Sequence, residues 1–132
     1  MHFLSTLLPF LAAATAVNAA LQVKVVVGMF NDEDSYPTPV AYAFNEVPCI
    51  SRVELANYVQ YSICDGTQFS VEGQNNLTLQ GCPAVGSPPT QILQNGTVVG
   101  NCSTYNTNWS CGACASSNEN EVPSIDGLVV CG

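Results

Sequence analysis

The stretch from Gln91 to Val99, QILQNGTVV, decides the fold class of this chain. At its centre lies Asn95-Gly96, a dipeptide that suits the two-residue turns of tight β-hairpins, in which positive φ angles are needed. An apolar pair lies on each side of the turn, Ile92-Leu93 before it and Val98-Val99 after it. This arrangement predicts a β-hairpin and a β-rich domain around it.

Other segments also have the composition of strands. Leu77-Thr78-Leu79 alternates between apolar and polar residues, as a strand with one buried face does. Leu21 to Val27, LQVKVVV, is rich in β-branched residues and almost wholly apolar, which is typical of a strand buried on both faces. Further candidate strands are Ala41–Val47, Thr67–Val71 and Ile125–Cys131, the last with Asp126-Gly127 as a turn.

One short helix is predicted near residues 52–60. Ser51 and Glu54 have the spacing of a capping box, and apolar residues after them fit a helical face. Residues 59–63 also alternate as a strand would, so a hairpin through this region is the other interpretation. We therefore predict a small, disulfide-bonded, β-rich domain of the α+β class, with an all-β sandwich or barrel as the alternative.

The N-terminus has the features of a secretory signal peptide. An apolar run from Leu4 to Ala14 is too short to span a bilayer, and Val17-Asn18-Ala19 places small or apolar residues before a cleavage site after Ala19. We expect a signal peptide over residues 1–19 and a single secreted cysteine-rich domain over residues 20–132. Since no later segment could span a membrane, we expect extracellular release and no membrane partner.

The charged residues exclude several classes of function. Two basic residues stand against ten acidic ones, for a net charge of −8, whereas nucleic acids and anionic lipids attract clustered Lys or Arg. The only histidine is His2, within the predicted signal peptide. Catalysis through a Ser-His or Cys-His pair and histidine-ligated metal are thereby excluded from the processed chain. We expect no enzyme, no cofactor, no metal and no nucleic-acid partner.

Seven cysteines in a short secreted chain indicate a disulfide scaffold. Three bridges and one remaining thiol are expected, and the sequence leaves the pairing open. The odd cysteine is either buried in a monomer or links two chains in a disulfide-bonded dimer. The cysteines are Cys49, Cys64, Cys82, Cys102, Cys111, Cys114 and Cys131.

The Cys-x-x-Cys pair Cys111 and Cys114 lies in NWSCGACASS, residues 108–117, and is similar to the thioredoxin signature Trp-Cys-Gly-Pro-Cys. It departs from that signature because Ser110 intrudes after Trp109 and Ala113 replaces proline. A four-cysteine zinc site would need reduced thiols, which an oxidising secretory route disfavours. We therefore interpret the two cysteines as halves of bridges to different partners.

Other residue groups could carry chemistry. Four N-glycosylation sequons are expected to mark surface positions, some of them occupied. Asp32, Glu33 and Asp34 could bind Ca²⁺, although a solvated loop is favoured because an EF-hand spacing is missing. Trp109 and Tyr105 could form a platform for a sugar ring, although packing on nearby disulfides is favoured for the tryptophan. The sequon asparagines are Asn76, Asn95, Asn101 and Asn108.

The whole pattern resembles the fungal small secreted cysteine-rich proteins. The resemblance rests on the Val17-Asn18-Ala19 signal end, the short acidic chain, seven cysteines, Asn-Gly turns and the lack of an enzyme motif. Many proteins of this class are studied as effectors that act on a host or in the extracellular space. The resemblance therefore implies an effector-like protein and assigns no functional residue.

Our first hypothesis is a non-enzymatic, effector-like protein that binds an extracellular protein or glycan of a host or of the environment. The first alternative is an inhibitor of an extracellular hydrolase, with 36–39 (YPTP) or 86–89 (GSPP) as the inhibitory loop. The second is a small carboxylate-dependent glycoside hydrolase or a glycan-binding module. Its candidate carboxylates are Glu46, Glu54, Asp65 and Glu72.

Overall fold

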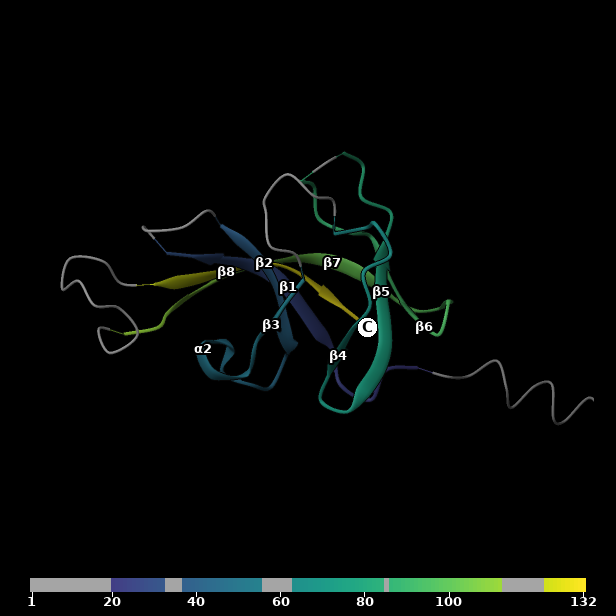
Figure 1. The fold of residues 1–132 in the computed structure, drawn as a ribbon, viewed down its shortest axis with the longest axis horizontal. Coiled ribbons are helices and arrows are strands. Elements are labelled where there is room, and N and C mark those ends of the chain that lie inside the picture. Colours follow the sequence, from purple (N-terminus) through teal and green to yellow (C-terminus); the bar gives the residue numbers. More distant parts are fainter. Residues whose placement is uncertain (1–19, 33–36, 56–62, 85, 113–122) are drawn as a thin grey trace, which may run out of the picture.

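A computed structural model describes residues 20–32, 37–55, 63–84, 86–112 and 123–132. These residues form eight strands and one short helix, α2, which covers Pro48–Ser51 (Figure 1). The strands are β1 Val25–Asn31, β2 Thr38–Ala43, β3 Val53–Glu54, β4 Phe69–Val71, β5 Gln74–Gln80, β6 Gln91–Gln94, β7 Thr97–Ser110 and β8 Ser124–Cys131.

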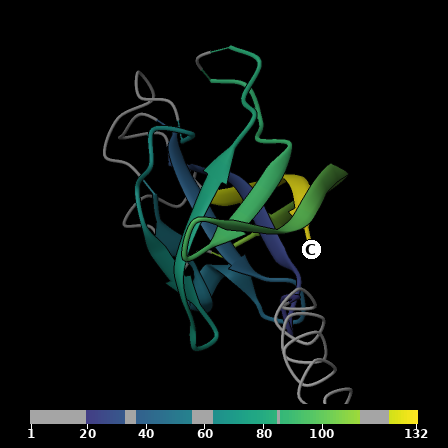
Figure 2. The same cartoon turned by 90° about the vertical axis from the view of Figure 1, so that its right-hand side faces the viewer.

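The strands make one antiparallel sheet with the order β3-β2-β1-β8-β7-β6-β5-β4. The two end strands, β3 and β4, contact each other, so the sheet curls into a nearly closed barrel. Figure 2 shows β5, β6 and β7 in teal and green in front of β1 and the yellow β8. The predicted β-rich, disulfide-bonded domain is confirmed, and its topology is that of the all-antiparallel barrel.

The hairpin predicted at Asn95-Gly96 is confirmed. Gln94 pairs with Thr97 across the turn, and the φ angles are 51° at Asn95 and 79° at Gly96, as a type I′ turn requires. The strand after the turn, β7, pairs with β6 as far as Asn101 and with β8 from Cys102 onward. One hairpin therefore starts the strand that connects the two halves of the barrel.

The strand β1 is buried on both faces, as predicted. Val25 and Val27 belong to the large core cluster, whereas Val26 belongs to a second cluster on the other face of the sheet. The strand begins later than predicted because the Gln74 side chain binds the preceding backbone. Gln74 Oε1 accepts the Gln22 N–H at 2.9 Å, and its Nε2 donates to the Val23 carbonyl at 3.1 Å.

The predicted helix over 52–60 is wrong for its described part. The helix is α2, which ends at Ser51, and Arg52 is already extended. Residues 53–54 form β3 and pair with β2, so Glu54 is not free to close a capping box with Ser51. Pro48 begins the helix instead, since proline suits a first helical turn. Residues 56–62 lie outside the described part of the chain.

Two strand boundaries also differ from prediction. The strand predicted over 41–47 ends at Ala43, because the Glu46 N–H donates to the Ala43 carbonyl at 3.0 Å and closes a turn. Asp126-Gly127 is not a turn but lies within β8. It adjoins irregularities in the pairing of β8 with β1 and β7, and a Cβ on Gly127 would collide with the Thr107 hydroxyl.

Three disulfides join elements that are distant in sequence. Cys49 of α2 bonds to Cys111 just after β7, Cys64 bonds to Cys82, and Cys102 of β7 bonds to Cys131 of β8. These bridges use six of the seven cysteines, and Cys114 lies outside the described residues. The Cys102–Cys131 bridge joins the C-terminal strand β8 to β7. Disulfides of this number are typical of an oxidising compartment.

The described part of the chain contains no helix with the length and hydrophobicity needed to cross a membrane.

Candidate functional site

Exposed apolar side chains gather where β2 leads into α2. Phe44 is 49% exposed, Val47 is 46% exposed and Ile50 is 85% exposed. Single exposed apolar residues are common on protein surfaces. Three of them within seven residues, from Phe44 to Ile50, form a group, and grouped apolar side chains are typical of interaction sites. This cluster is the starting point for a candidate site.

The chain geometry turns these side chains outward. The Phe44 N–H donates to the Lys24 carbonyl at 2.9 Å, which ends β2 beside β1. In α2, Pro48 is buried and Cys49 is tied to Cys111, so one side of the helix faces the barrel. Ile50 is the next residue in the helix and projects away from that side into solvent.

The neighbouring strand β7 extends the apolar surface. The rings of Phe44 and Tyr105 contact each other, with centroids 5.5 Å apart and planes tilted by 51°. Trp109 is 39% exposed and pairs across the strands with Ile125 of the second core cluster. The Cys49–Cys111 bridge holds α2 at the end of β7. We call the surface formed by these side chains the α2 face: Phe44, Val47, Ile50, Tyr105 and Trp109.

Two buried hydroxyls lie beneath this surface. The Tyr42 hydroxyl and the Thr107 hydroxyl make no hydrogen bond of normal geometry with the described residues. Burial raises the pKa of Tyr42, and the nearby Thr107 hydroxyl offsets the rise only in part. The contact between the two hydroxyls is therefore weak, and burial is the main cause of the raised pKa of Tyr42. Tyr42 stays neutral and serves as packing under the face.

The edge of the α2 face is acidic. Glu46 lies between Phe44 and Val47 in the chain, and its carboxylate accepts a hydrogen bond from the Ser51 hydroxyl at 3.4 Å. Both basic residues of the chain are also near this edge: the Arg52 guanidinium lies 4.1 Å from the Phe30 ring centroid and donates to the Cys49 carbonyl at 2.8 Å, and Lys24 is exposed beside Phe44. The arrangement leaves negative charge beside the apolar side chains.

Two of the predicted carboxylates meet at this edge. The pKa of Glu72 is raised because the Glu46 carboxyl hydrogen-bonds to it and because the two negative charges repel each other. A raised pKa in the folded state stabilises the protein below the unfolded pKa, and this stabilisation is lost as the pH rises through the folded pKa. At neutral pH, where Glu72 is deprotonated, its repulsion from Glu46 therefore slightly destabilises the folded protein.

Glu72→Gln is expected to raise the Tm slightly at neutral pH and not at about pH 3.5, where the Glu72 carboxyl of the unmodified protein is protonated and no longer repels Glu46. The effect is small because the groups are exposed and solvent screens them. Thermal unfolding at the two pH values measures it. The control Glu54→Gln removes the same charge from β3, and an equal gain from that change would contradict the assignment to the pair.

The structure describes all four candidate carboxylates of the glycoside hydrolase alternative. Glu46 and Glu72 are within hydrogen-bonding reach of each other, closer than the roughly 5 Å that a retaining enzyme needs between its two carboxyls. Asp65 Oδ1 accepts the Thr67 hydroxyl at 2.6 Å and the Thr67 N–H at 2.9 Å, which lowers the pKa of Asp65. Glu54 is exposed on β3.

The two metal sites that the sequence analysis disfavoured can be compared with the structure. Cys102, Cys111 and Cys131 are all in disulfides, so the alternative of a four-cysteine zinc site is wrong. Among the residues that the structure describes, no three His, Cys, Asp or Glu side chains gather as metal ligands. In the acidic loop, Asp32 lies just after β1, and residues 33–34 lie outside the described part. Cys111 bonds to Cys49 and not to Cys114, which agrees with the prediction that the two cysteines of the Cys-x-x-Cys pair do not bond to each other.

The predicted aromatic pair contributes to the α2 face in another way. Tyr105 packs with Phe44 and not as a free platform beside Trp109. Trp109 is 39% exposed and belongs to neither core cluster of the described residues, and its packing on a nearby disulfide stays a prediction. Phe44 and Val47 had not been singled out from the sequence. The signal that could have found Phe44 is the apolar run that continues one residue past Ala43 into a turn, whereas Val47 follows Asn45 and Glu46 and carries no such signal.

All four sequon asparagines are exposed, and glycosylation stays a prediction. The Asn76 side-chain amide donates to Asn95 Oδ1 at 2.8 Å, so these two sites are adjacent. The Asn108 amide donates to Asp126, and Asn101 lies in β7 beside the bonded Cys102. Glycans at Asn76 and Asn95 would cover the end of the barrel around the β6–β7 turn.

The two proposed inhibitory loops lie elsewhere. Thr38 and Pro39 are the first residues of β2, and residue 36 lies outside the described part. In the other loop, Gly86 is exposed, Ser87 is half-buried and Pro89 is buried. Residues 86–88 line a small cavity against β1.

Comparison of the chain with protein-family models, with curated proteins and with solved structures gives no match.

Proposed function

We propose that this chain is a secreted, non-enzymatic protein that acts by binding another extracellular protein, in the manner of an effector. The observation that carries the proposal is the α2 face. Ile50, 85% exposed, lies at its centre on a helix that a disulfide holds to the barrel. Protein interfaces are enriched in such aromatic and large apolar side chains.

The rigidity of the face favours binding. A four-residue helix has little stability alone, but α2 is fixed by buried Pro48 and by the Cys49–Cys111 bridge. A surface that is already ordered loses little conformational entropy when a partner docks. The face is therefore suited to recognition without rearrangement.

The charge around the face indicates the chemistry of the partner. Glu46 and Glu72 lie at its edge, and the whole chain carries a net charge of −8. A partner with an apolar centre and a rim of Lys or Arg would complement both features, and it would be steered toward this protein at low ionic strength. The proposed partner is thus a basic extracellular protein.

The test compares two identical substitutions in the secreted protein. Val47 and Val98 are 46% and 43% exposed, but Val98 is the second residue of β7, just after the β6–β7 turn, and Figure 1 shows β6 on the right and α2 on the left of the molecule. Partners are captured from extracellular fluid, identified by mass spectrometry and purified, and their Kd values are measured. Val47→Ala and Ile50→Ala are expected to weaken binding by about 10-fold or more, as truncation of central contacts does.

Val98→Ala is expected to leave the Kd unchanged. Equal Kd values for all three variants, or turnover of a substrate by the purified protein, would overturn the proposal. Binding that does not weaken with added salt would contradict the basic rim and leave the apolar contact standing.

A further inference from the structure

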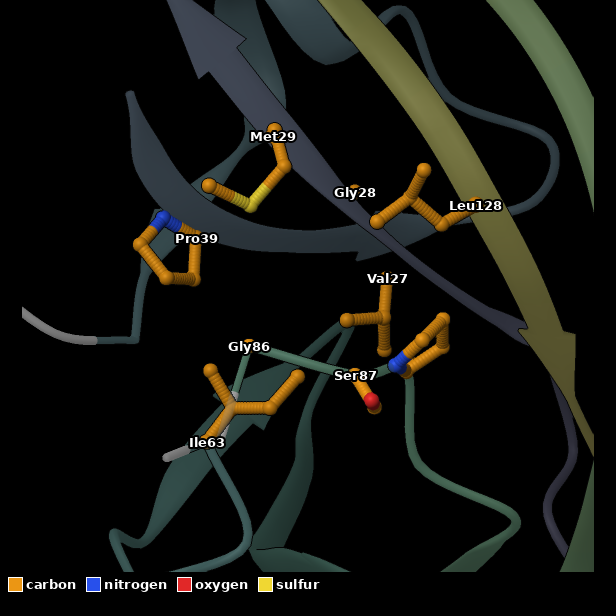
Figure 3. A pocket seen from close by; sticks show the side chains of 9 residues that line it. Val27, Gly28, Met29, Pro39, Ile63, Gly86, Ser87 and Leu128 are labelled. Atoms are coloured by element: carbon orange, nitrogen blue, oxygen red, sulfur yellow. The ribbon is translucent and has the colours of Figure 1, made fainter. Parts of the chain in front are cut away.

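A second feature of the barrel is a small apolar cavity beside β1 (Figure 3). Its volume is about 120 Å³. It is partly enclosed. Three strands, β1, β2 and β8, form part of its wall, and Ile63 and residues 86–88 form the rest. The lining residues are Val27, Gly28, Met29, Pro39, Ile63, Gly86, Ser87, Pro88 and Leu128.

The backbone of the sheet creates this space. The pairing of β1 with β8 shifts between Val27 and Gly28, so that Gly28 pairs with Gly127 and Leu128 lies opposite the irregularity. A Cβ on Gly28 would collide with the Asp126 carbonyl, so glycine is required for this close approach. Strand pairing therefore fixes the walls of the cavity that β1, β2 and β8 provide.

The segment of residues 86–88 covers the other side. Figure 3 shows Gly86 and Ser87 passing beneath Val27, with Ile63 beside them and Met29 and Leu128 above. The Ser87 N–H donates to the Ala84 carbonyl at 3.0 Å, which holds this segment in a turn. The cavity therefore lies between the barrel wall and an ordered loop.

The lining decides which ligand would fit. None of the nine side chains is charged, and the Ser87 hydroxyl is the one polar side-chain group among them. A charged molecule would lose its hydration there without a partner. An apolar cavity of about 150 Å³ in another protein stays dry and binds benzene, which sets the scale for a ligand here.

We infer that this cavity is a binding site for a small neutral apolar molecule, of the size of one six-membered ring or a four- to five-carbon chain. The site is separate from the α2 face. Successive residues of a strand face opposite ways, and the cavity is lined by Val27 and Met29, whereas Val26 and Phe30 pack in the second cluster beneath α2. The inference therefore stands whether or not the proposed protein partner exists.

Met29 provides a direct probe of the site. The chain contains two methionines, Met1 and Met29, so a sample with ¹³C-labelled methionine methyl groups gives a simple spectrum, and Met29→Leu assigns the signal. Titration of the disulfide-intact protein with benzene is expected to move the Met29 signal to saturation. Naphthalene, with two fused rings, is too large for the volume and is expected to bind at least about 10-fold more weakly.

Leu128→Phe adds a ring to the wall and is expected to weaken benzene binding about 10-fold or more by occupying the space. Leu93→Phe makes the same change at a half-buried position on β6, away from the cavity, and is expected to leave the affinity unchanged. A Met29 signal that does not respond to benzene would overturn the inference. Equal binding of benzene and naphthalene to the unmodified protein would also overturn it, without depending on how any variant folds.

Discussion

Replacing both Cys49 and Cys111 by alanine lowers the free energy of unfolding by about 4 kcal/mol, the largest effect we expect from removing one of the bridges. The two cysteines are 62 positions apart, so their bond closes the longest loop of the three and restricts the unfolded chain most. Denaturant unfolding under non-reducing conditions measures the change. The double substitution is used so that no half of the bridge remains to pair elsewhere.

The matched comparison is Cys64→Ala with Cys82→Ala. That bridge spans 18 positions, and its removal is expected to cost about 3 kcal/mol. The two pairs also differ in function, because only the first holds α2 against β7. Loss of the Cys49–Cys111 bridge should weaken partner binding as well as stability. A larger loss of stability from the Cys64–Cys82 pair would contradict the loop argument.

Ile92→Ala is expected to lower the free energy of unfolding by about 2–5 kcal/mol. Ile92 is fully buried and lies between Leu79 on β5 and Gly100 on β7, at the centre of the large core cluster. Removing three carbons there leaves a cavity that paired strands on both sides cannot close. Denaturant unfolding monitored by circular dichroism measures the loss.

The same substitution at Ile50 provides the control. Ile50 is 85% exposed, so Ile50→Ala should change stability by no more than about 0.5 kcal/mol. The two isoleucines thus separate two roles of an apolar side chain, one for folding and one for binding. If Ile50→Ala destabilised the protein as much as Ile92→Ala, loss of binding by that variant would report unfolding and not the α2 face.

The sequence predicted best where one segment carries its own signal. Asn95-Gly96 defines its hairpin because both residues adopt positive φ there, and this depends on the two residues alone. The alternation in β5 and the continuous apolar run of β1 likewise report burial on one face or on two. Such patterns are local, so they could be interpreted before the strands were placed in the sheet.

Prediction failed where a local signal competed with a distant partner. The capping pattern of Ser51 and Glu54 favours a helix, but Glu54 pairs with Val40 and extends the sheet. Asp126-Gly127 favours a turn, yet in β8 the glycine is needed for close packing against β7. In both cases pairing with a strand outweighed a preference of a few residues.

The sequence by itself determined a β-rich domain with disulfides, and only the tertiary structure decided which surfaces it offers. The pairing of Cys49 with Cys111, the gathering of Phe44 and Ile50 with Trp109, and the cavity beside Met29 all join residues from separate strands. Local preferences are set by the chain over a few residues, whereas these sites depend on how the sheet closes. Closure of the barrel depends on whether the burial of apolar surface over the whole domain outweighs the loss of conformational entropy, and no single segment determines that sum.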